Sequence, residues 1–231
     1  MKKSTIATLI VFFLLIPATI YFGSRLQGRS WYFTGTLVII EVLIPFIMAF
    51  EGRKPQAREL VVIAVMCAIA VAARAAIPLP HFKPMFAVII ISGFAFGPET
   101  GFLVGAVSAF ASNFFYGQGP DTPWQMLAYG TAGLLGGWFY ARGWVGRKPV
   151  VMAIFGYLCV QLIVGPLLDT GTVFQAFQKN SSDIPVWGYY LSGLPVNASQ
   201  GLCTFLTLLL LGKPLLEKLD RVKLKFGISE E

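Results

Sequence analysis

The sequence has few charged residues for its length. Only 13% of its 231 residues are Asp, Glu, Lys or Arg, whereas 56% are hydrophobic, and the mean hydropathy is +0.70. This is more apolar surface than a water-soluble domain buries in its core. We therefore predict an all-α integral membrane protein.

Several catalytic motifs and a disulfide framework are also missing. The chain has no Gly-x-x-x-x-Gly-Lys-Ser/Thr, no His-Glu-x-x-His and no Gly-x-Ser-x-Gly, and its one histidine is His81. Cys67, Cys159 and Cys203 fall in apolar runs without metal-ligand spacing, so we interpret them as small apolar residues. The sequence therefore argues against an enzyme, and we expect neither a metal nor a cofactor.

Apolar segments dominate what is present. A straight membrane span needs about 20 residues, and the fourth and fifth of these segments are shorter than that. A tight turn at 97–101 joins the two, so they form either two short helices or a re-entrant pair buried in protein. The eight segments are Thr5–Phe22, Trp31–Phe50, Glu59–Ile77, Pro84–Phe96, Thr100–Phe115, Trp124–Ala141, Pro149–Leu168 and Gly188–Leu211.

Basic residues are unevenly distributed among the connections. With the amino terminus inside, the inner segments hold thirteen Lys and Arg residues, and the outer loops hold four, namely Arg25, Arg29, Lys83 and Lys179. This positive-inside bias predicts that both termini are cytoplasmic. The positive-inside bias then accounts for the net charge of +7, so we do not expect nucleic acid as a partner.

Polar and aromatic residues gather in the segments that this topology places outside. They occupy the loop 78–84, the stretch 113–130 and the 19-residue polar segment 169–187, which we predict to be a loop. A loop of that length in a compact protein is more often functional than a simple connection. The outer side is therefore the predicted side of recognition.

Polar residues inside the adjoining segments recur at helical spacing. In the last segment Asn197, Gln200 and Thr204 share one face, and Gln125 and Tyr129 share a face of the sixth. Because unpaired amides are costly in hydrocarbon, these groups face the bundle interior or a cavity. They either join neighbouring helices or line a ligand site.

Two charged residues lie within predicted spans. Arg74 is four residues from the outer end of its segment, where it either extends to the headgroups or, with His81 and Lys83, meets an anionic or amide-rich ligand. Glu41 lies in the middle of the second segment. It is either protonated or paired with a basic group that the sequence does not identify.

Small residues form a second pattern. Ala64, Ala68 and Ala72, which we call the alanine stripe, recur every four residues, and glycine pairs with the same spacing begin at Gly101 and Gly133. Such spacing lets helix backbones approach closely. We expect the glycine pairs to pack within this chain, whereas the alanine stripe fits either an internal contact or a partner protein.

From Arg58 onward the chain resembles a family of membrane receptors. The alanine stripe, Gly105 and three motifs are similar to the S component, the substrate-binding membrane subunit of an energy-coupling factor (ECF) vitamin transporter. The resemblance implies a six-helix S-component core at 58–231, preceded by two additional transmembrane helices within 1–57. The three motifs are Ile77-Pro-Leu-Pro80, Phe82-Lys-Pro-Met-Phe86 and Gly93-Phe-Ala-Phe-Gly-Pro-Glu-Thr-Gly101.

The resemblance implies a vitamin receptor in a bacterial plasma membrane. In this family the ligand lies in an outward-facing cavity closed by three loops, which are here 78–83, 116–123 and 169–187. The alanine stripe matches the surface that docks a transmembrane T component. Two cytosolic ATPase subunits complete the transporter, and the loaded S component topples in the lipid membrane to deliver its ligand.

The segment Gly117–Met126 is similar to a signature of the cobalamin-type branch, which implies cobalamin or a related corrinoid as the ligand. Riboflavin or a queuosine precursor is the alternative, and a self-contained secondary transporter using Glu41 is another. The candidate ligand-binding residues are Arg74, His81, Phe82, Lys83, Asn113, Tyr116, Gln118, Thr122, Trp124, Gln125, Tyr129, Asp169, Tyr189, Asn197 and Gln200.

Overall fold

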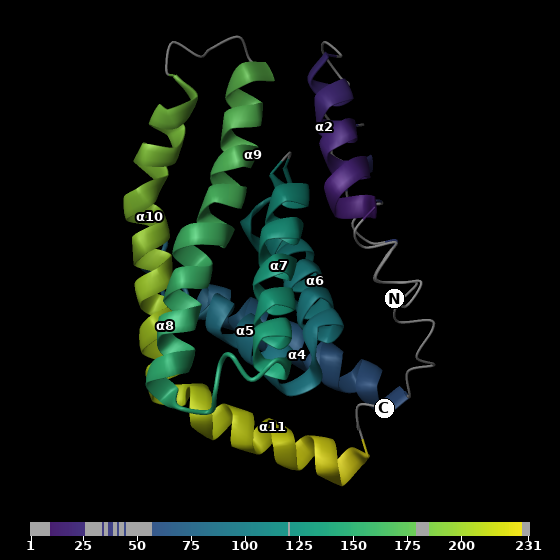
Figure 1. Cartoon of the computed structure of the whole chain (residues 1–231), viewed down its shortest axis with the longest axis vertical. Helices are drawn as coiled ribbons and strands as arrows, with labels where there is room; N and C mark the ends of the chain where they lie inside the picture. The colour runs from purple at the N-terminus through teal and green to yellow at the C-terminus, as the bar shows by residue number, and fades with distance from the viewer. Residues whose placement is uncertain are drawn as a thin grey trace.

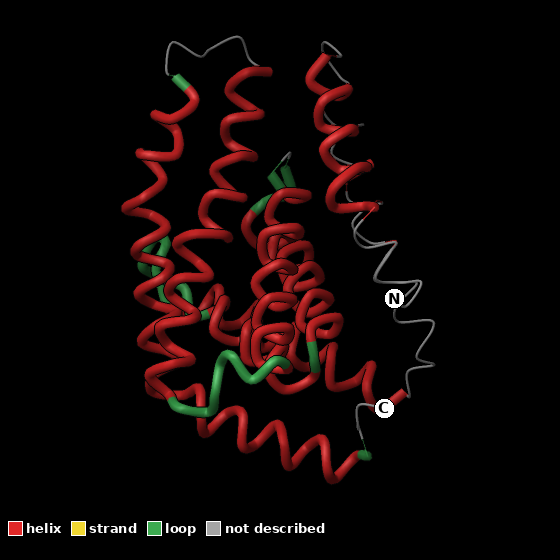
Figure 2. The backbone as a smooth tube through the Cα atoms, viewed as in Figure 1, coloured by secondary structure: helices red, strands yellow, loops and turns green. Residues whose placement is uncertain are grey.

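The computed structural model describes residues 10–25, 34, 37–38, 41, 44, 57–119, 121–178 and 185–227. Within this part of the chain every regular element is a helix (Figure 2). Three helical stretches are long and apolar enough to cross a membrane, and they are Ala57–Ala76, Pro149–Val173 and Val186–Phe226. The predicted all-α membrane fold is therefore confirmed.

The helices follow the predicted apolar segments, except that the seventh continues as helix past its predicted end at Leu168. Two long stretches consist of an α-helix, a π-helical turn and a second α-helix in succession. The π-helical turns η2 and η3 interrupt these stretches, so that α8 continues into α9 and α10 continues into α11 (Figure 1). The elements are η1 (Val11–Leu15), α2 (Ile16–Arg25), α4 (Ala57–Ala76), α5 (Met85–Phe96), α6 (Pro98–Tyr116), α7 (Thr122–Ala141), α8 (Pro149–Cys159), η2 (Val160–Val164), α9 (Gly165–Gln178), α10 (Val186–Thr207), η3 (Leu208–Gly212) and α11 (Lys213–Phe226).

The fourth and fifth apolar segments form two separate helices, α5 and α6. They meet at Gly97, whose φ of 89° lies in the left-handed region that favours glycine, and Pro98 then begins α6. All twelve residues of α5 are buried. A helix that is apolar on every side belongs inside a protein, and α5 accordingly forms the centre of the core.

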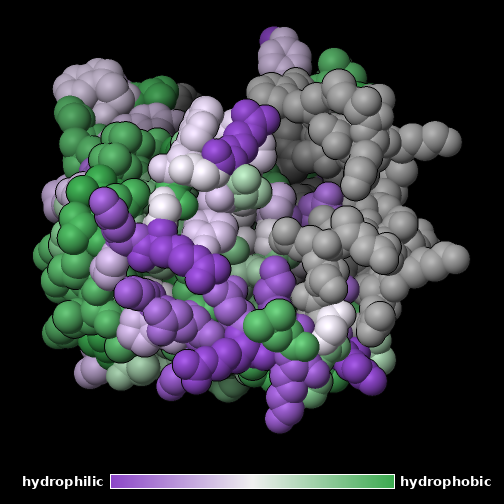
Figure 3. Space-filling view, turned by 60° about the horizontal axis from the view of Figure 1, so that its bottom comes forward, coloured by the Kyte–Doolittle hydropathy of each residue, from purple (hydrophilic) through white to green (hydrophobic). Residues whose placement is uncertain are grey.

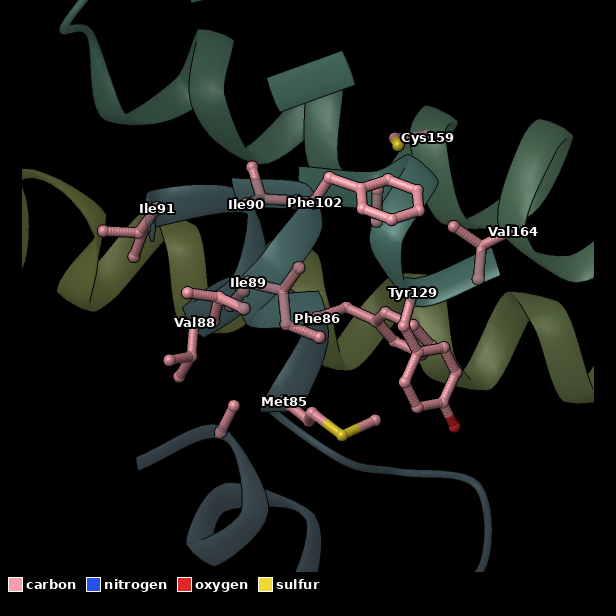
Figure 4. Close-up of a cluster of buried hydrophobic side chains, with 14 of the residues drawn as sticks. Met85, Phe86, Val88, Ile89, Ile90, Ile91, Phe102, Tyr129, Cys159 and Val164 are labelled. Atoms are coloured by element: carbon pink, nitrogen blue, oxygen red, sulfur yellow. The ribbon is translucent and has the colours of Figure 1, made fainter. Parts of the chain in front are cut away.

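Side chains from α5, α6 and α7 fill that core (Figure 4). Phe86 of α5 meets Tyr129 of α7 edge to face, with ring centroids 4.8 Å apart. Phe102 of α6 is fully buried beside Gly130, where an added Cβ would lie 2.6 Å from the Phe102 ring. The core therefore depends on aromatic rings that occupy space left open by small residues.

Glycine allows the backbones of α5, α6 and α7 to touch. A Cβ built on Gly133 would lie 2.0 Å from the carbonyl oxygen of Gly101, and one on Gly93 would lie 2.2 Å from the oxygen of Gly133. No side chain fits at these distances. The expectation that the glycine pairs pack within this chain is confirmed.

Helix α11 crosses one end of the bundle (Figure 1). Asp220 of α11 forms an ion pair of 2.9 Å with Arg147 from the α7–α8 connection. The Nζ atom of Lys223 donates to the carbonyl oxygen of Ala95 at 2.7 Å, and Arg58 donates to the carbonyl oxygen of Phe226 at 3.4 Å. These contacts bring α11, the α7–α8 connection, the end of α5 and the start of α4 together, and we call this the α11 end.

The N-terminal helix α2 stands to one side of the other helices (Figure 1). The hydroxyl of Thr19 donates a hydrogen bond to a carboxylate oxygen of Glu41, so the contact that the described residues show is with a hydroxyl group and not with the predicted basic group. Most of the predicted second span, 31–50, and the basic residues Arg29 and Lys179 lie outside the described residues. The two-helix N-terminal region therefore stays a prediction.

Candidate functional site

Arg74 is the centre of a polar network at the C-terminal end of α4. Its Nη1 atom donates to the hydroxyl of Ser112 and, at 2.8 Å, to the side-chain oxygen of Asn113, both on α6. Ser112 and Asn113 are buried, with 0% and 2% of their surface exposed. Arg74 is itself half-buried, and its guanidinium is therefore held to α6 by buried polar groups.

Aromatic rings complete the surroundings of this guanidinium. Its Cζ atom lies 4.6 Å from the ring centroid of Tyr116 and 5.9 Å from that of Tyr129. The Tyr116 hydroxyl donates to the backbone carbonyl of Arg74 at 3.1 Å. Among the described residues no carboxylate forms an ion pair with Arg74, so aromatic faces and neutral acceptors stabilise its charge.

The network continues from Asn113 into the connection between α6 and α7. The Asn113 amide donates to the Thr122 hydroxyl at 3.0 Å, and that hydroxyl donates to the side-chain oxygen of Gln118 at 3.0 Å. The Gln118 amide in turn donates to the carbonyl of Phe110 at 3.0 Å. Six predicted site residues, Arg74, Asn113, Tyr116, Gln118, Thr122 and Tyr129, are therefore joined in one cluster.

A second polar cluster joins α9 to α10. The Asn197 amide donates to a carboxylate oxygen of Asp169 at 2.9 Å. The prediction of a loop from 169 is wrong, because α9 continues to Gln178 and Asp169 lies inside it. The polar side chains of this segment bond within the protein, as Thr170 does with Tyr190 at 2.9 Å, so their polarity does not require a loop.

Trp124 at the start of α7 packs against α9. Only 6% of its surface is exposed, and a Cβ on Gly171 would lie 2.8 Å from its indole ring. Gln175 on the same helix donates a hydrogen bond to Asp121, just before α7. Trp124 is therefore not a residue of the membrane-interface belt, whereas Tyr116, with 49% of its surface exposed, is open at the surface.

Three amide oxygens are buried without a hydrogen-bond partner among the described residues. They belong to Gln125 of α7, Gln161 of η2 and Gln200 of α10. The π-helical turn η2 packs against both α7 and α10, so the three amides come from neighbouring elements. Sequence reasoning missed Gln161, although an amide in the middle of an apolar run was the signal that could have found it.

The remaining predicted residues are not joined to these clusters by side-chain hydrogen bonds in the described part of the chain. His81 is exposed and has a φ of 56°, in the left-handed region. Lys83 donates to the carbonyl of Ile77 in its own connection, and Phe82 is half-buried. Tyr189 is half-buried on α10, where its carbonyl accepts a hydrogen bond from Ser192.

The alanine stripe lines a groove that adjoins the Arg74 network at Tyr116. The groove has a volume of about 730 Å³ and lies between α4 and α6. Ala64, Ala68 and Ala72 are exposed along it, and Val107 and Phe115 of α6 form the other side. Nearly all of its lining is apolar, so its recognition is a matter of shape and packing.

Comparison with known proteins identifies the family. The family model for the S component of the ECF-type riboflavin transporter matches residues 54–219, which cover α4 to α10, η3 and the first half of α11. Comparison with curated proteins and with solved structures gave no significant match. With its helical membrane fold, its two polar clusters and this match over most of its length, the chain belongs to the family of ECF-type riboflavin transporter S components.

Proposed function

We propose that this S component binds a vitamin with a flat ring system, with riboflavin as the first candidate. The observation that carries the proposal is the set of buried, unpartnered amide oxygens on Gln125, Gln161 and Gln200. Buried acceptors without donors are unfavourable, and ring N–H or hydroxyl groups of a ligand would satisfy them. A small number of amides among apolar helices is the usual chemistry of a vitamin site.

Close helix packing near these amides favours a thin ligand. A Cβ on Gly165 would lie 2.3 Å from the Asn197 side chain, and one on Gly193 would lie 2.4 Å from the carboxylate of Asp169. The helices α9 and α10 are therefore close together both at Gly165 and at Gly193. A flat ring can enter between such helices with smaller displacements than a bulky molecule requires.

Cobalamin is the second candidate, and the sequence of Gly117–Met126 is what favours it. In the structure this segment is held by Thr122 and Gln118, and Asp121 within it is tied to Gln175 of α9. A corrinoid would have to open these contacts to reach the buried amides. The family description, which names riboflavin, favours the smaller ligand.

We propose further that the apolar groove along the alanine stripe docks a T component, and that two ATPase subunits drive transport. The absence of a phosphate-binding loop from the sequence supports the need for separate ATPases. The cationic α11 end is proposed to face the cytoplasm of a bacterium, with both termini on that side, because basic residues concentrate there.

Ligand binding can be tested by thermal stability of the purified protein with riboflavin, cobalamin or a queuosine precursor. We expect riboflavin to raise the melting temperature most. Replacing Gln161 or Gln200 with Leu should weaken binding about fivefold each, the effect of one lost hydrogen bond. Thr207→Val is a matched control on α10, because the Thr207 hydroxyl bonds only to its own helix, at the carbonyl of Cys203.

The outcomes separate the alternatives. If cobalamin alone stabilised the protein, the ligand would be cobalamin and not riboflavin. Unchanged affinity in both glutamine variants would overturn the assigned site. Uptake by the isolated chain in liposomes, driven by an ion gradient, would instead show a secondary transporter. Co-purification of a T component and two ATPases is the result expected for an S component.

A further inference from the structure

Helix α11 begins where the lipid-facing surface of α10 and η3 ends. Leu210 and Leu211 expose 70% and 51% of their surface, and the next residues, Gly212 and Lys213, begin the turn into α11. Figure 1 shows α11 running across the end of the bundle and not along the direction of α10. A helix that leaves the hydrocarbon layer and turns crosswise lies at the depth of the lipid headgroups.

One side of α11 is bound to the protein itself. Leu216 is 1% exposed, and Leu215 and Leu219 pack against the apolar core. Asp220 and Lys223 are held by the ion pair with Arg147 and by the carbonyl of Ala95. The side of this helix that carries Leu215, Leu216 and Leu219 is therefore covered, and its opposite side faces outward.

That outward side is strongly cationic. Lys213, Lys218, Arg221 and Lys225 are exposed, and Glu217, 4.0 Å from Lys213, is the acidic residue among them. Figure 3 shows hydrophilic residues in a band across this end of the molecule. Four cations against one acid leave a net positive surface along the helix.

Large apolar side chains are exposed beside these cations. Leu224 exposes 84% of its surface and Phe226 exposes 40%. On the nearby α7–α8 connection, the guanidinium of Arg142 lies 4.1 Å from the ring centroid of Trp138 and 5.9 Å from that of Trp144. Trp144 is 61% exposed. Tryptophan and arginine together are typical of the boundary between lipid and water.

We propose that the outward side of α11 binds the headgroups of anionic phospholipids. The cations match the charge of those headgroups, and the exposed Leu224 and Phe226 lie beside them at the C-terminal end of the helix. An acidic protein surface would match the charge too, but it would leave these apolar side chains and Trp144 without an apolar environment. The mixture of cations and apolar residues at this depth therefore favours lipid.

The contact has a consequence for the whole bundle. Because α11 is bonded to the ends of α4, α5 and the α7–α8 connection, lipid bound to α11 holds the entire α11 end at the headgroup layer. Anionic lipid would therefore resist tilting of this protein in the membrane. This inference depends on the membrane fold and on α11, and not on the identity of the vitamin.

The test measures competition between brominated phosphatidylglycerol and brominated phosphatidylcholine for quenching of the protein's tryptophan fluorescence. We expect the chain to prefer phosphatidylglycerol, and the preference to fall as salt is added. The variant K213Q/K218Q/R221Q/K225Q should lose about fivefold or more of this preference, since one cation at the surface accounts for about that factor.

A charge-conserving variant, K213R/K218R/R221K/K225R, is the matched control and should keep the preference. Equal quenching by the two lipids in the wild-type protein would overturn the proposal, as would an unchanged preference in the glutamine variant. If the glutamine variant keeps its preference but no longer co-purifies with ATPase subunits, the occupant is an acidic protein surface and the lipid assignment is wrong.

Discussion

Replacement of Arg74 with Met tests whether the Arg74 network holds the bundle together. The change removes the hydrogen bonds to Ser112 and to Asn113, which lie at buried positions, and the contact with the Tyr116 ring. Hydrogen bonds to charged groups contribute about 1.5–3 kcal/mol in soluble proteins but average about 0.6 kcal/mol between membrane helices. With a cation–π contact of about 1 kcal/mol, we expect a loss of about 3 kcal/mol.

For a chain of this length that loss corresponds to a decrease of roughly 6–12 °C in melting temperature. The assay is thermal unfolding in detergent, followed by the fluorescence of a thiol-reactive dye at the buried cysteines. The matched control is Arg25→Met. Arg25 makes the same types of contact with Tyr21, a hydrogen bond of 2.9 Å and a ring distance of 5.2 Å, but at an exposed site. We expect little change in the melting temperature of Arg25→Met, because contacts at exposed sites contribute little to stability.

A melting temperature of Arg74→Met close to that of Arg25→Met would contradict the structural role of Arg74. A second measurement separates structure from recognition. If Arg74 serves mainly to hold α4 to α6, the affinity of the folded variant for its vitamin should fall less than tenfold. A loss beyond a hundredfold with an unchanged melting temperature would make Arg74 a ligand contact and would contradict the structural role.

Two further predictions concern helix contacts. Gly133→Ala should destabilise the protein by about 3 kcal/mol or more, because its Cβ would overlap the Gly101 carbonyl, whereas Gly146→Ala, with open space around it, should melt like the wild type. Ala68→Trp should abolish co-purification of a T component and leave vitamin affinity unchanged, whereas Leu158→Trp, on an exposed part of α8, should affect neither. Loss of vitamin binding in Ala68→Trp would contradict a role of the alanine stripe in partner docking alone.

The sequence by itself determined the class of the protein and the positions of its helices. Long apolar runs leave few stable structures in a membrane, because every backbone hydrogen bond must be made within the chain. The helices from α4 to α8 and α10 accordingly lie close to where hydrophobicity predicted them, whereas α9 continues to Gln178, past the predicted end at Leu168. For the fifteen candidate ligand residues, the sequence showed which ones share a helix face but not which neighbouring helix each face contacts.

Tertiary structure decided which polar groups satisfy one another. Asn113, Gln118 and Thr122, whose contact with a ligand stays a prediction, form hydrogen bonds with one another. Gln161 was missed and has a buried oxygen without a partner in the described part of the chain. Asp169 shows the same limit, because its polarity suggested a loop and its pairing with Asn197 allows a helix. Whether a polar group has a hydrogen-bond partner depends on contacts between segments that are distant in the sequence, and a single sequence does not show which segments meet.

The direction of α11 is also a tertiary result. Its basic residues were visible in the sequence, but only the packing of Leu216 and the bonds of Asp220 and Lys223 show which side of the helix is covered. Local composition sets how strongly a segment prefers lipid or water. The contacts in the folded protein determine which surface remains free for a partner, because they bury one side of a helix and leave the other side exposed.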